Sequence, residues 1–172
     1  PIFMGDLVLF PSLNGKIVIV NHKNKKVVNS ISVDSSSKFN NLIYLNVIND
    51  NLIAATPNKI MTLSSNNVIT KDFEIRSVLV NKESIYIASN DGKIIELDIN
   101  LEILNMKKYK YAKFYTLAYG KNLYALESQD YLISISEDFS SDKIYDFSFN
   151  EESKVISIKD TIYFDDEYIK LK

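Results

Sequence analysis

The sequence predicts an all-β protein made of β-propeller blades, each of four antiparallel strands and about four to five in number. Three observations support this fold class. Short apolar runs alternate with other residues at a period of two, the period of a strand with one buried face. The runs occur in pairs separated by turn residues, which is typical of hairpins. These pairs recur five times along the 172 residues, as the blades of a propeller do.

The clearest hairpin spans residues 84–98, where two apolar runs flank Asn90, Asp91 and Gly92. The dipeptide Asp-Gly supplies the positive φ angles that a tight hairpin turn requires. Ile85 and Ile87 alternate with other residues before the turn, and a similar alternation follows it. One face of each strand is therefore expected to point toward a core.

The same pattern recurs in residues 7–20, 52–63, 123–135 and 162–171. The second run of each pair begins at residue 16, 59, 93, 131 or 168, so the intervals are 43, 34, 38 and 37 residues. A four-stranded blade takes ~40–45 residues. Further strand candidates between the hairpins complete this count. The predicted organisation is one β-propeller domain in five pieces: a partial blade 1–40, blades 41–76, 77–111 and 112–153, and a partial blade 154–172.

Incomplete blades at both ends allow two arrangements. Either the terminal pieces pair and close a small ring, or the chain is a fragment of a larger propeller. We favour the fragment, because incomplete blades at both ends of a complete molecule would leave two large open edges. Such edges would also allow self-association. The serine-rich residues 34–38 are predicted to form a loop between blades and not a linker between domains.

The composition removes most chemical functions. The chain has no cysteine and one histidine, His22, so it offers neither a thiolate nucleophile nor a multi-histidine metal centre. Its 4 glycines are too scattered for a nucleotide-binding fingerprint. No apolar run approaches the ~20 residues of a membrane-spanning helix. We therefore predict no enzyme, no cofactor and no membrane span.

Two groups of residues are weak site candidates. Asp165, Asp166 and Glu167 could offer oxygen ligands to calcium, but they also stand where the fifth hairpin must turn, and turns are rich in aspartate. An exposed turn is the favoured interpretation. Lys107, Lys108, Lys110 and Lys113 alternate with aromatic residues, which is typical of single-stranded nucleic-acid binding. A net charge of −2 and a single arginine, Arg76, favour instead an outer strand whose lysines discourage edge pairing, with no nucleic-acid partner.

Residues 84–106, with Asp91-Gly92 in the turn and Leu97-Asp98 after the second run, resemble the pyrroloquinoline-quinone-like repeat. This repeat occurs in quinoprotein propellers and in the outer-membrane assembly propeller lipoprotein. The chain departs from it in having no tryptophan, the residue that docks neighbouring blades in that family. Leu104, Phe73 and Phe147 are expected to take over this packing. The tryptophan-aspartate repeat resembles the chain less, because its Trp and its Gly-His pair are both missing.

A propeller presents loops on a rigid ring, and this sequence shows no catalytic set of residues, so we predict a non-catalytic scaffold that binds protein partners. The resemblance implies binding through one rim of the propeller and a role in bacterial envelope protein assembly. It also implies a periplasmic or envelope-associated location, compatible with a lipid anchor on a segment before Pro1, while a cytoplasmic location stays open. The alternative function is binding of a small ligand or calcium in the central channel, or carboxylate-based hydrolysis. Such a channel would be lined by the starts of the inner strands and the loops that precede them.

Overall fold

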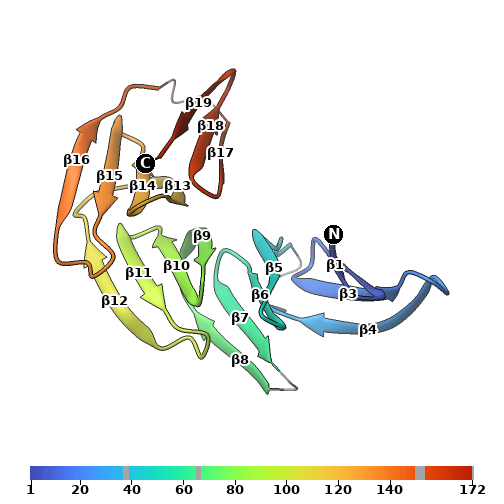
Figure 1. The fold of residues 1–172 in the computed structure, drawn as a ribbon. Coiled ribbons are helices and arrows are strands. Elements are labelled where there is room, and N and C mark those ends of the chain that lie inside the picture. The colour runs from blue at the N-terminus through green and yellow to red at the C-terminus, as the bar shows by residue number, and fades with distance from the viewer. Residues whose placement is uncertain (37–38, 65–66, 150–153, 172) are drawn as a thin grey trace. The chain divides into compact units, whose positions relative to one another are not determined.

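The computed structural model describes residues 1–36, 39–64, 67–149 and 154–171 of the chain. Within them every regular element is a β-strand. These residues contain no helix that is long and apolar enough to cross a membrane. The strands form four sheets of four strands and one of three, all antiparallel (Figure 1). The all-β, propeller-like fold predicted from the hairpin repeat is therefore confirmed.

The chain divides into two compact units, Pro1–Ile75 and Arg76–Lys172. The first unit holds two sheets, each a meander in which consecutive strands are neighbours. The strands are β1 (Ile2–Met4), β2 (Leu7–Pro11), β3 (Lys16–Asn21) and β4 (Lys26–Ser32), then β5 (Tyr44–Ile48), β6 (Asn51–Ala55), β7 (Lys59–Ser64) and β8 (Asn67–Asp72).

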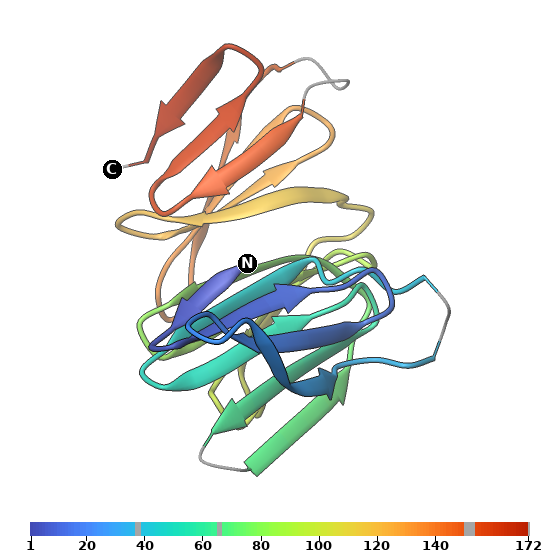
Figure 2. The ribbon, with the colours of Figure 1, turned by 90° about the vertical axis from the view of Figure 1, so that its right-hand side faces the viewer.

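The second unit holds the remaining three sheets, which are again meanders, and the last of them, in red and orange, is clearest in Figure 2. Their strands are β9 (Ile75–Asn81), β10 (Ser84–Ser89), β11 (Lys93–Leu97) and β12 (Ile103–Lys108), then β13 (Phe114–Tyr119), β14 (Leu123–Glu127), β15 (Tyr131–Ile135) and β16 (Asp142–Asp146), and finally β17 (Val155–Ile158), β18 (Thr161–Phe164) and β19 (Glu167–Lys170).

The first sheet corrects one prediction. It has four strands, whereas the sequence predicted an incomplete set in residues 1–40, because β1 pairs with β2 along Ile2↔Leu9, Phe3↔Val8 and Met4↔Leu7. This strand has only three residues and lies two residues before the next, so no alternating pattern could reveal it. Gly5, with a φ of 57°, makes the tight turn between them. The last sheet has three strands among the described residues, as predicted.

Apolar residues of the middle strands form the contacts between sheets. In the first unit Leu9 and Ile17 pack against Leu52 and Met61 of the following sheet. In the second unit Ile94 of β11 packs in one cluster with residues of β13, β14 and β15, namely Phe114, Leu117, Leu123, Ala125, Ile133 and Ile135. The opposite face of the sheet β13–β16 packs against β17–β19. Each core therefore lies between two sheets and not within one.

The residues expected to replace the docking tryptophan have different outcomes. Phe147 does pack between sheets, because its ring lies 5.4 Å from that of Phe164 in an edge-to-face arrangement. The expectation was wrong for Leu104, whose side chain is 54% exposed on β12. Phe73 is partly buried.

Asp34 ties the loop after the first sheet to the second sheet. Its side chain is buried and accepts hydrogen bonds from the backbone N–H of Ser36 at 2.9 Å and the hydroxyl of Thr56 at 3.2 Å. Burial by itself would raise the pKa of this carboxyl, but these bonds outweigh it and hold the pKa at about 2. Ser37 and Lys38, the end of the loop predicted from its serines, lie outside the described residues.

We expect the cores between sheets to carry most of the stability. Replacing Ile94, which is fully buried, by Ala should lower the free energy of unfolding by about 2–5 kcal/mol, because it removes apolar contacts and leaves a cavity. The matched control is Ile144→Ala on β16, where the isoleucine is 59% exposed and the loss should stay below about 1 kcal/mol. Urea unfolding followed by circular dichroism measures both. Equal losses would contradict the assignment of the core.

We also expect Asp34 to make the first unit sensitive to acid. The pKa of its carboxyl is about 2 in the folded chain and near the ordinary 3.8 when unfolded, so the unfolded state binds the proton first. Its contribution is present above pH 3.8 and is lost as the pH falls toward 2. Asp34→Asn should be less stable at neutral pH and should lose less stability across that window. Thermal unfolding between the two pH values tests this, and parallel curves for both proteins would reject it.

Candidate functional site

Two neighbouring cavities of the second unit form the candidate site. The first, of about 330 Å³, is lined by Arg76, Asn90, Lys113, Phe114, Tyr115 and Ser128. The second, of about 590 Å³, is lined by Asn90, Asp91, Lys108, Lys110, Tyr111, Ala112, Lys113 and Gln129. Because Asn90 and Lys113 line both, the two form one continuous surface, called here the basic cleft.

The cleft lies where four chain segments of two neighbouring sheets meet. Arg76 is the second residue of β9, and Asn90 follows β10 in the turn to β11. Lys113 directly precedes β13, and Ser128 follows β14 in the turn to β15. These are starts of first strands and turns between middle strands, which antiparallel pairing brings to the same end of each sheet.

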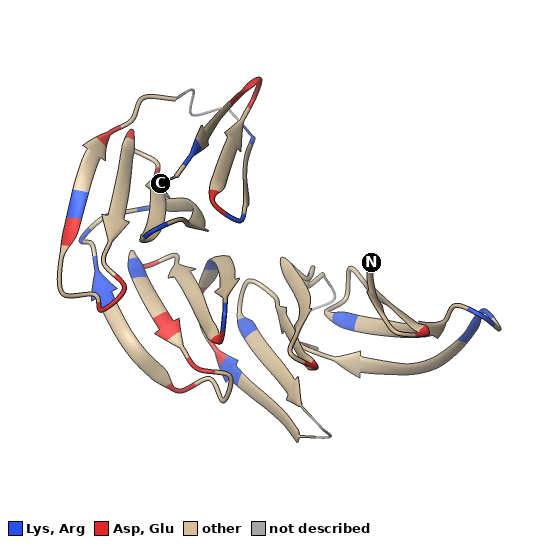
Figure 3. Cartoon of the chain, viewed as in Figure 1, with Lys and Arg blue, Asp and Glu red and all other residues tan. Residues whose placement is uncertain are grey.

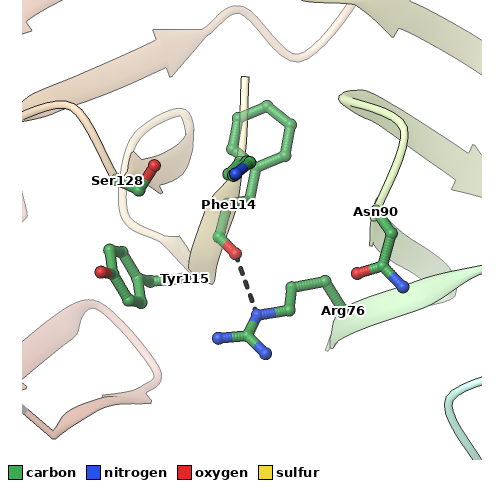
Figure 4. Close-up of a pocket in the computed structure, with 6 residues that line it drawn as sticks. Arg76, Asn90, Phe114, Tyr115 and Ser128 are labelled. Carbon is green, nitrogen blue, oxygen red and sulfur yellow. Dashed lines mark hydrogen bonds between the residues drawn. The ribbon is translucent and has the colours of Figure 1, made fainter. Parts of the chain in front are cut away.

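Arg76 is held in place by the neighbouring sheet. Its Nε–H donates to the backbone carbonyl of Phe114 at 3.2 Å. Figure 4 shows that this bond turns the two terminal nitrogens of the guanidinium away from Phe114, into the space beside Tyr115. An arginine fixed through Nε keeps its terminal N–H groups available for a ligand.

Glu127 organises the loops on the other side of the cleft. This buried carboxylate accepts the backbone N–H of Lys113 at 2.9 Å and that of Gln129 at 2.7 Å. The hydroxyl of Ser128 donates to it at 3.3 Å, and the Ser128 backbone N–H donates to the Lys113 carbonyl at 2.9 Å. The acid is thus used to position the cleft and is not exposed to a ligand.

Residues 110–113, in the loop that follows Tyr109, form the outer wall of the cleft. Gly92, with a φ of 81°, accepts the Tyr109 backbone N–H at 2.8 Å, which starts the loop. Tyr111 has a φ of 68°, an uncommon conformation for an aromatic residue, and its side chain is 80% exposed. The Lys110 Nζ lies 4.9 Å from the centre of its ring. The loop thus presents a tyrosine and a lysine at the mouth of the cleft.

Ion pairs divide the basic residues into two groups. Lys107 pairs with Asp142 at 3.0 Å, while Lys93 and Lys108 lie 2.6 Å and 3.7 Å from Asp91. The hydrogen bond from Lys107 lowers the pKa of Asp142, and the bonds from Lys93 and Ser89 lower the pKa of Asp91. Both acids are therefore ionised at neutral pH and largely neutralise these lysines.

The cations of the second group line the cleft without such neutralisation. Among the described residues, no carboxylate oxygen lies within 4.0 Å of a side-chain nitrogen of Arg76, Lys110 or Lys113. Figure 3 shows that elsewhere in this unit basic and acidic residues are interspersed along the strands and turns. The local excess of positive charge distinguishes the cleft.

The structure places some of the predicted site residues in the cleft and others outside it. Of the four lysines proposed for nucleic acid, Lys108, Lys110 and Lys113 line the cleft, whereas Lys107 lies on β12 in its ion pair. Asp165 and Asp166 occupy the exposed turn between β18 and β19, and Glu167 begins β19. Within the described ranges, no three potential ligands are arranged to hold a metal ion. The exposed turn is the interpretation that the sequence favoured, and calcium binding there stays an untested alternative.

Sequence reasoning did not connect Arg76, Asn90, Tyr111 and Ser128 with a common site. Arg76 stood out only as the single arginine, and Asn90 only as a turn residue. One signal was available: the starts of inner strands and the loops before them were expected to face a ligand, and both Arg76 and Lys113 occupy such positions.

Known structures share the fold of this chain. No protein-family model matches the chain. The fold is that of a β-propeller-like protein: BamB from Moraxella catarrhalis is similar with a TM-score of 0.74 at 13% identity, over 95% of this chain and 54% of that one. The WD40 domain of Pan2 from Neurospora crassa is similar with a TM-score of 0.68 at 11% identity, over 94% and 52%. At these identities the likeness concerns the fold.

Part of a curated bacterial protein is similar to this chain in sequence. The chain is 33% identical over 183 residues to the plasminogen-binding protein PgbB of Helicobacter pylori strain J99, covering 98% of this chain and 34% of PgbB. PgbB of strain 26695 matches equally, at 33% identity over the same shares. The chain thus spans about a third of the length of the curated relatives that it matches.

We expect Gly92 to be needed for the shape of the cleft. A Cβ at this position would lie 2.5 Å from the Tyr109 carbonyl oxygen and 3.1 Å from that of Ala112, so Gly92→Ala must displace the outer wall. Gly5→Ala is the matched control, because Gly5 also has a positive φ but no atom within 4 Å of the added Cβ. The control should lose about 1–2 kcal/mol from its backbone conformation alone, and Gly92→Ala clearly more. Thermal unfolding by circular dichroism compares them, and equal losses would contradict this.

Proposed function

We propose that the chain is a non-catalytic protein-binding module and that plasminogen is its partner. The observation that carries the proposal is the 33% identity to PgbB, a plasminogen-binding protein, along 98% of this chain. A match that extends over all the repeats supports a common fold with comparable surfaces.

The residues of the chain support binding over catalysis. His22, the one histidine, lies in the exposed hairpin after β3, 3.6 Å from Asp6, and not beside a nucleophile. The buried carboxylates Glu96 and Glu127 already accept hydrogen bonds from their own sheets. Arginine and tyrosine, which the basic cleft combines, are enriched in protein interfaces.

The role in envelope protein assembly and the periplasmic or envelope-associated location stay predictions. Both came from the resemblance to the assembly lipoprotein. BamB shares the fold at 13% identity, which carries no partner or location with it.

We expect the purified chain to bind plasminogen in a saturable way. Biolayer interferometry with the chain immobilised and plasminogen in solution measures this. The aligned third of PgbB should bind comparably, because it is the segment that the chain matches. BamB of Moraxella catarrhalis is the control for unspecific binding to a propeller surface and should not bind.

Two results would reject the proposal. Absence of binding by the chain, when full-length PgbB binds, would place the activity in the remainder of that protein. Equal binding by BamB would show that the signal does not depend on the residues shared with PgbB.

A further inference from the structure

We propose that the basic cleft binds carboxylate side chains of an acidic peptide segment on the partner protein. This inference rests on the proposed protein-binding function and names the part of the surface and the chemistry that it would use. It starts from three cations, Arg76, Lys110 and Lys113, that line the cleft and whose side-chain nitrogens have no carboxylate oxygen of the described residues within 4.0 Å.

Arg76 is suited to a carboxylate by its geometry. The guanidinium is planar, and its Nε–H is already bonded to Phe114. The terminal nitrogens can therefore form the paired parallel hydrogen bonds that arginine makes with a carboxylate. Because the side chain is already oriented, less conformational entropy is lost on binding than for a free arginine.

A neutral donor and a second cation lie near the position such a carboxylate would take. Lys113 lines the same cavity as Arg76, and the side-chain amide of Asn90 adds the neutral donor. Among the described residues, no carboxylate lines this first cavity. Glu127 lies behind it, but its oxygens face the backbone N–H groups of Lys113 and Gln129.

The second cavity makes a peptide a better occupant than a single small anion. It continues from the first through Asn90 and Lys113 and is the larger of the two, at about 590 Å³ against 330 Å³. Tyr111 at its wall is exposed and holds a left-handed backbone conformation. Strained residues persist where the surrounding structure enforces them, often at binding sites. An extended chain could place one acidic side chain at Arg76 and lay its next residues against Tyr111.

Nucleic acid fits the same surface less well. Lys107 and Lys108, which would extend the positive surface along β12, are paired with Asp142 and Asp91. Polyanion binding draws on many phosphate contacts and on a basic protein, whereas this chain has a net charge of −2. A short acidic segment needs only the few cations that the cleft holds.

The test uses the whole chain and three probes. Fluorescence anisotropy would compare a labelled peptide of alternating glutamate and alanine, the same peptide with glutamine for glutamate, and a labelled single-stranded DNA. We expect the glutamate peptide to bind, with an affinity that falls as salt is added, and the glutamine peptide not to bind. Inorganic phosphate should compete only weakly, because it occupies one cavity and makes no contact with Tyr111.

Variants assign the binding to the cleft. Lys113→Gln and Arg76→Gln should each weaken the glutamate peptide about tenfold or more, since each removes charge-assisted hydrogen bonds. Arg76→Lys keeps the charge but loses the paired donors, and should fall between. Lys121→Gln, on an exposed lysine between β13 and β14 that lines neither cavity, is the matched control and should bind as the native chain does. Circular dichroism verifies that each variant is folded. If Arg76→Gln does not fold, the binding of the glutamate peptide by Lys113→Gln alone decides the test.

Each outcome decides for or against the cleft. No binding of the glutamate peptide, or unchanged binding by Lys113→Gln, overturns the inference, and so does tighter binding of DNA that the same variants weaken. If plasminogen binds both the native chain and Lys113→Gln equally, the cleft is excluded while the proposed function stands. If the glutamate peptide binds in the cleft but plasminogen does not bind, the cleft stands and plasminogen is the wrong partner.

Discussion

The sheet β13–β16 is apolar on both faces, and the second unit depends on covering both. Ala125 and Ile133 point to one side, toward β9–β12, and Leu126 and Leu132 point to the other, toward β17–β19. A sheet of this kind cannot present either face to water, because each buried side chain contributes to stability only when a neighbour excludes the solvent. Stacking consecutive sheets satisfies the requirement, and it also fixes the ends of the strands where the loops of the basic cleft begin.

Buried carboxylates add specificity to this apolar stacking. Glu96 on β11 accepts hydrogen bonds from Ser84 at 2.7 Å, Tyr86 at 3.1 Å and Asn105 at 2.7 Å. Its partners lie on the two strands that flank it, so a slip in register would leave a buried charge without donors. Glu127 and Asp34 act similarly on loops instead of strands. Apolar packing thus determines which sheets stack. The buried acids fix the strand register and the loops that join the sheets.

The fold could be predicted because its signals are local. Each hairpin combines alternating apolar residues with turn residues a few positions apart, as at Asn90, Asp91 and Gly92, and the turn at Asp50 has the positive φ of 61° that a tight hairpin needs. The strand β1 was not predicted, because three residues are too few to show the alternation of apolar and other residues that indicates a strand. The prediction that Leu104 packs between blades was wrong, because an apolar side chain on an outer strand can lie on either face of the sheet.

The cleft could not be predicted, because it is made by pairings that the sequence does not display. Arg76 and the Phe114 carbonyl that holds it are 38 positions apart, and Glu127 reaches back 14 positions to Lys113. The lysine-aromatic pattern at residues 107–115 was visible, but the ion pairs that separate Lys107 and Lys108 from Lys110 and Lys113 depend on Asp91 and Asp142. Free and neutralised cations look the same in a sequence.

A comparison of the repeats shows how the turn at Ser128, one of the two turns that line the cleft, differs from the others. In the first three, a hydroxyl at the end of the second strand or just after it accepts the backbone N–H of the lysine that opens the third strand: Ser12 with Lys16, Thr56 with Lys59, and Ser89 with Lys93. In the fourth, tyrosine replaces that lysine at Tyr131, and the hydroxyl of Ser128 bonds to Glu127. The turn is then pinned to the loop before β13, which fixes Lys113 at the cleft. Departures from a locally consistent pattern concentrate at functional sites, and this repeat departs where its cations are left free.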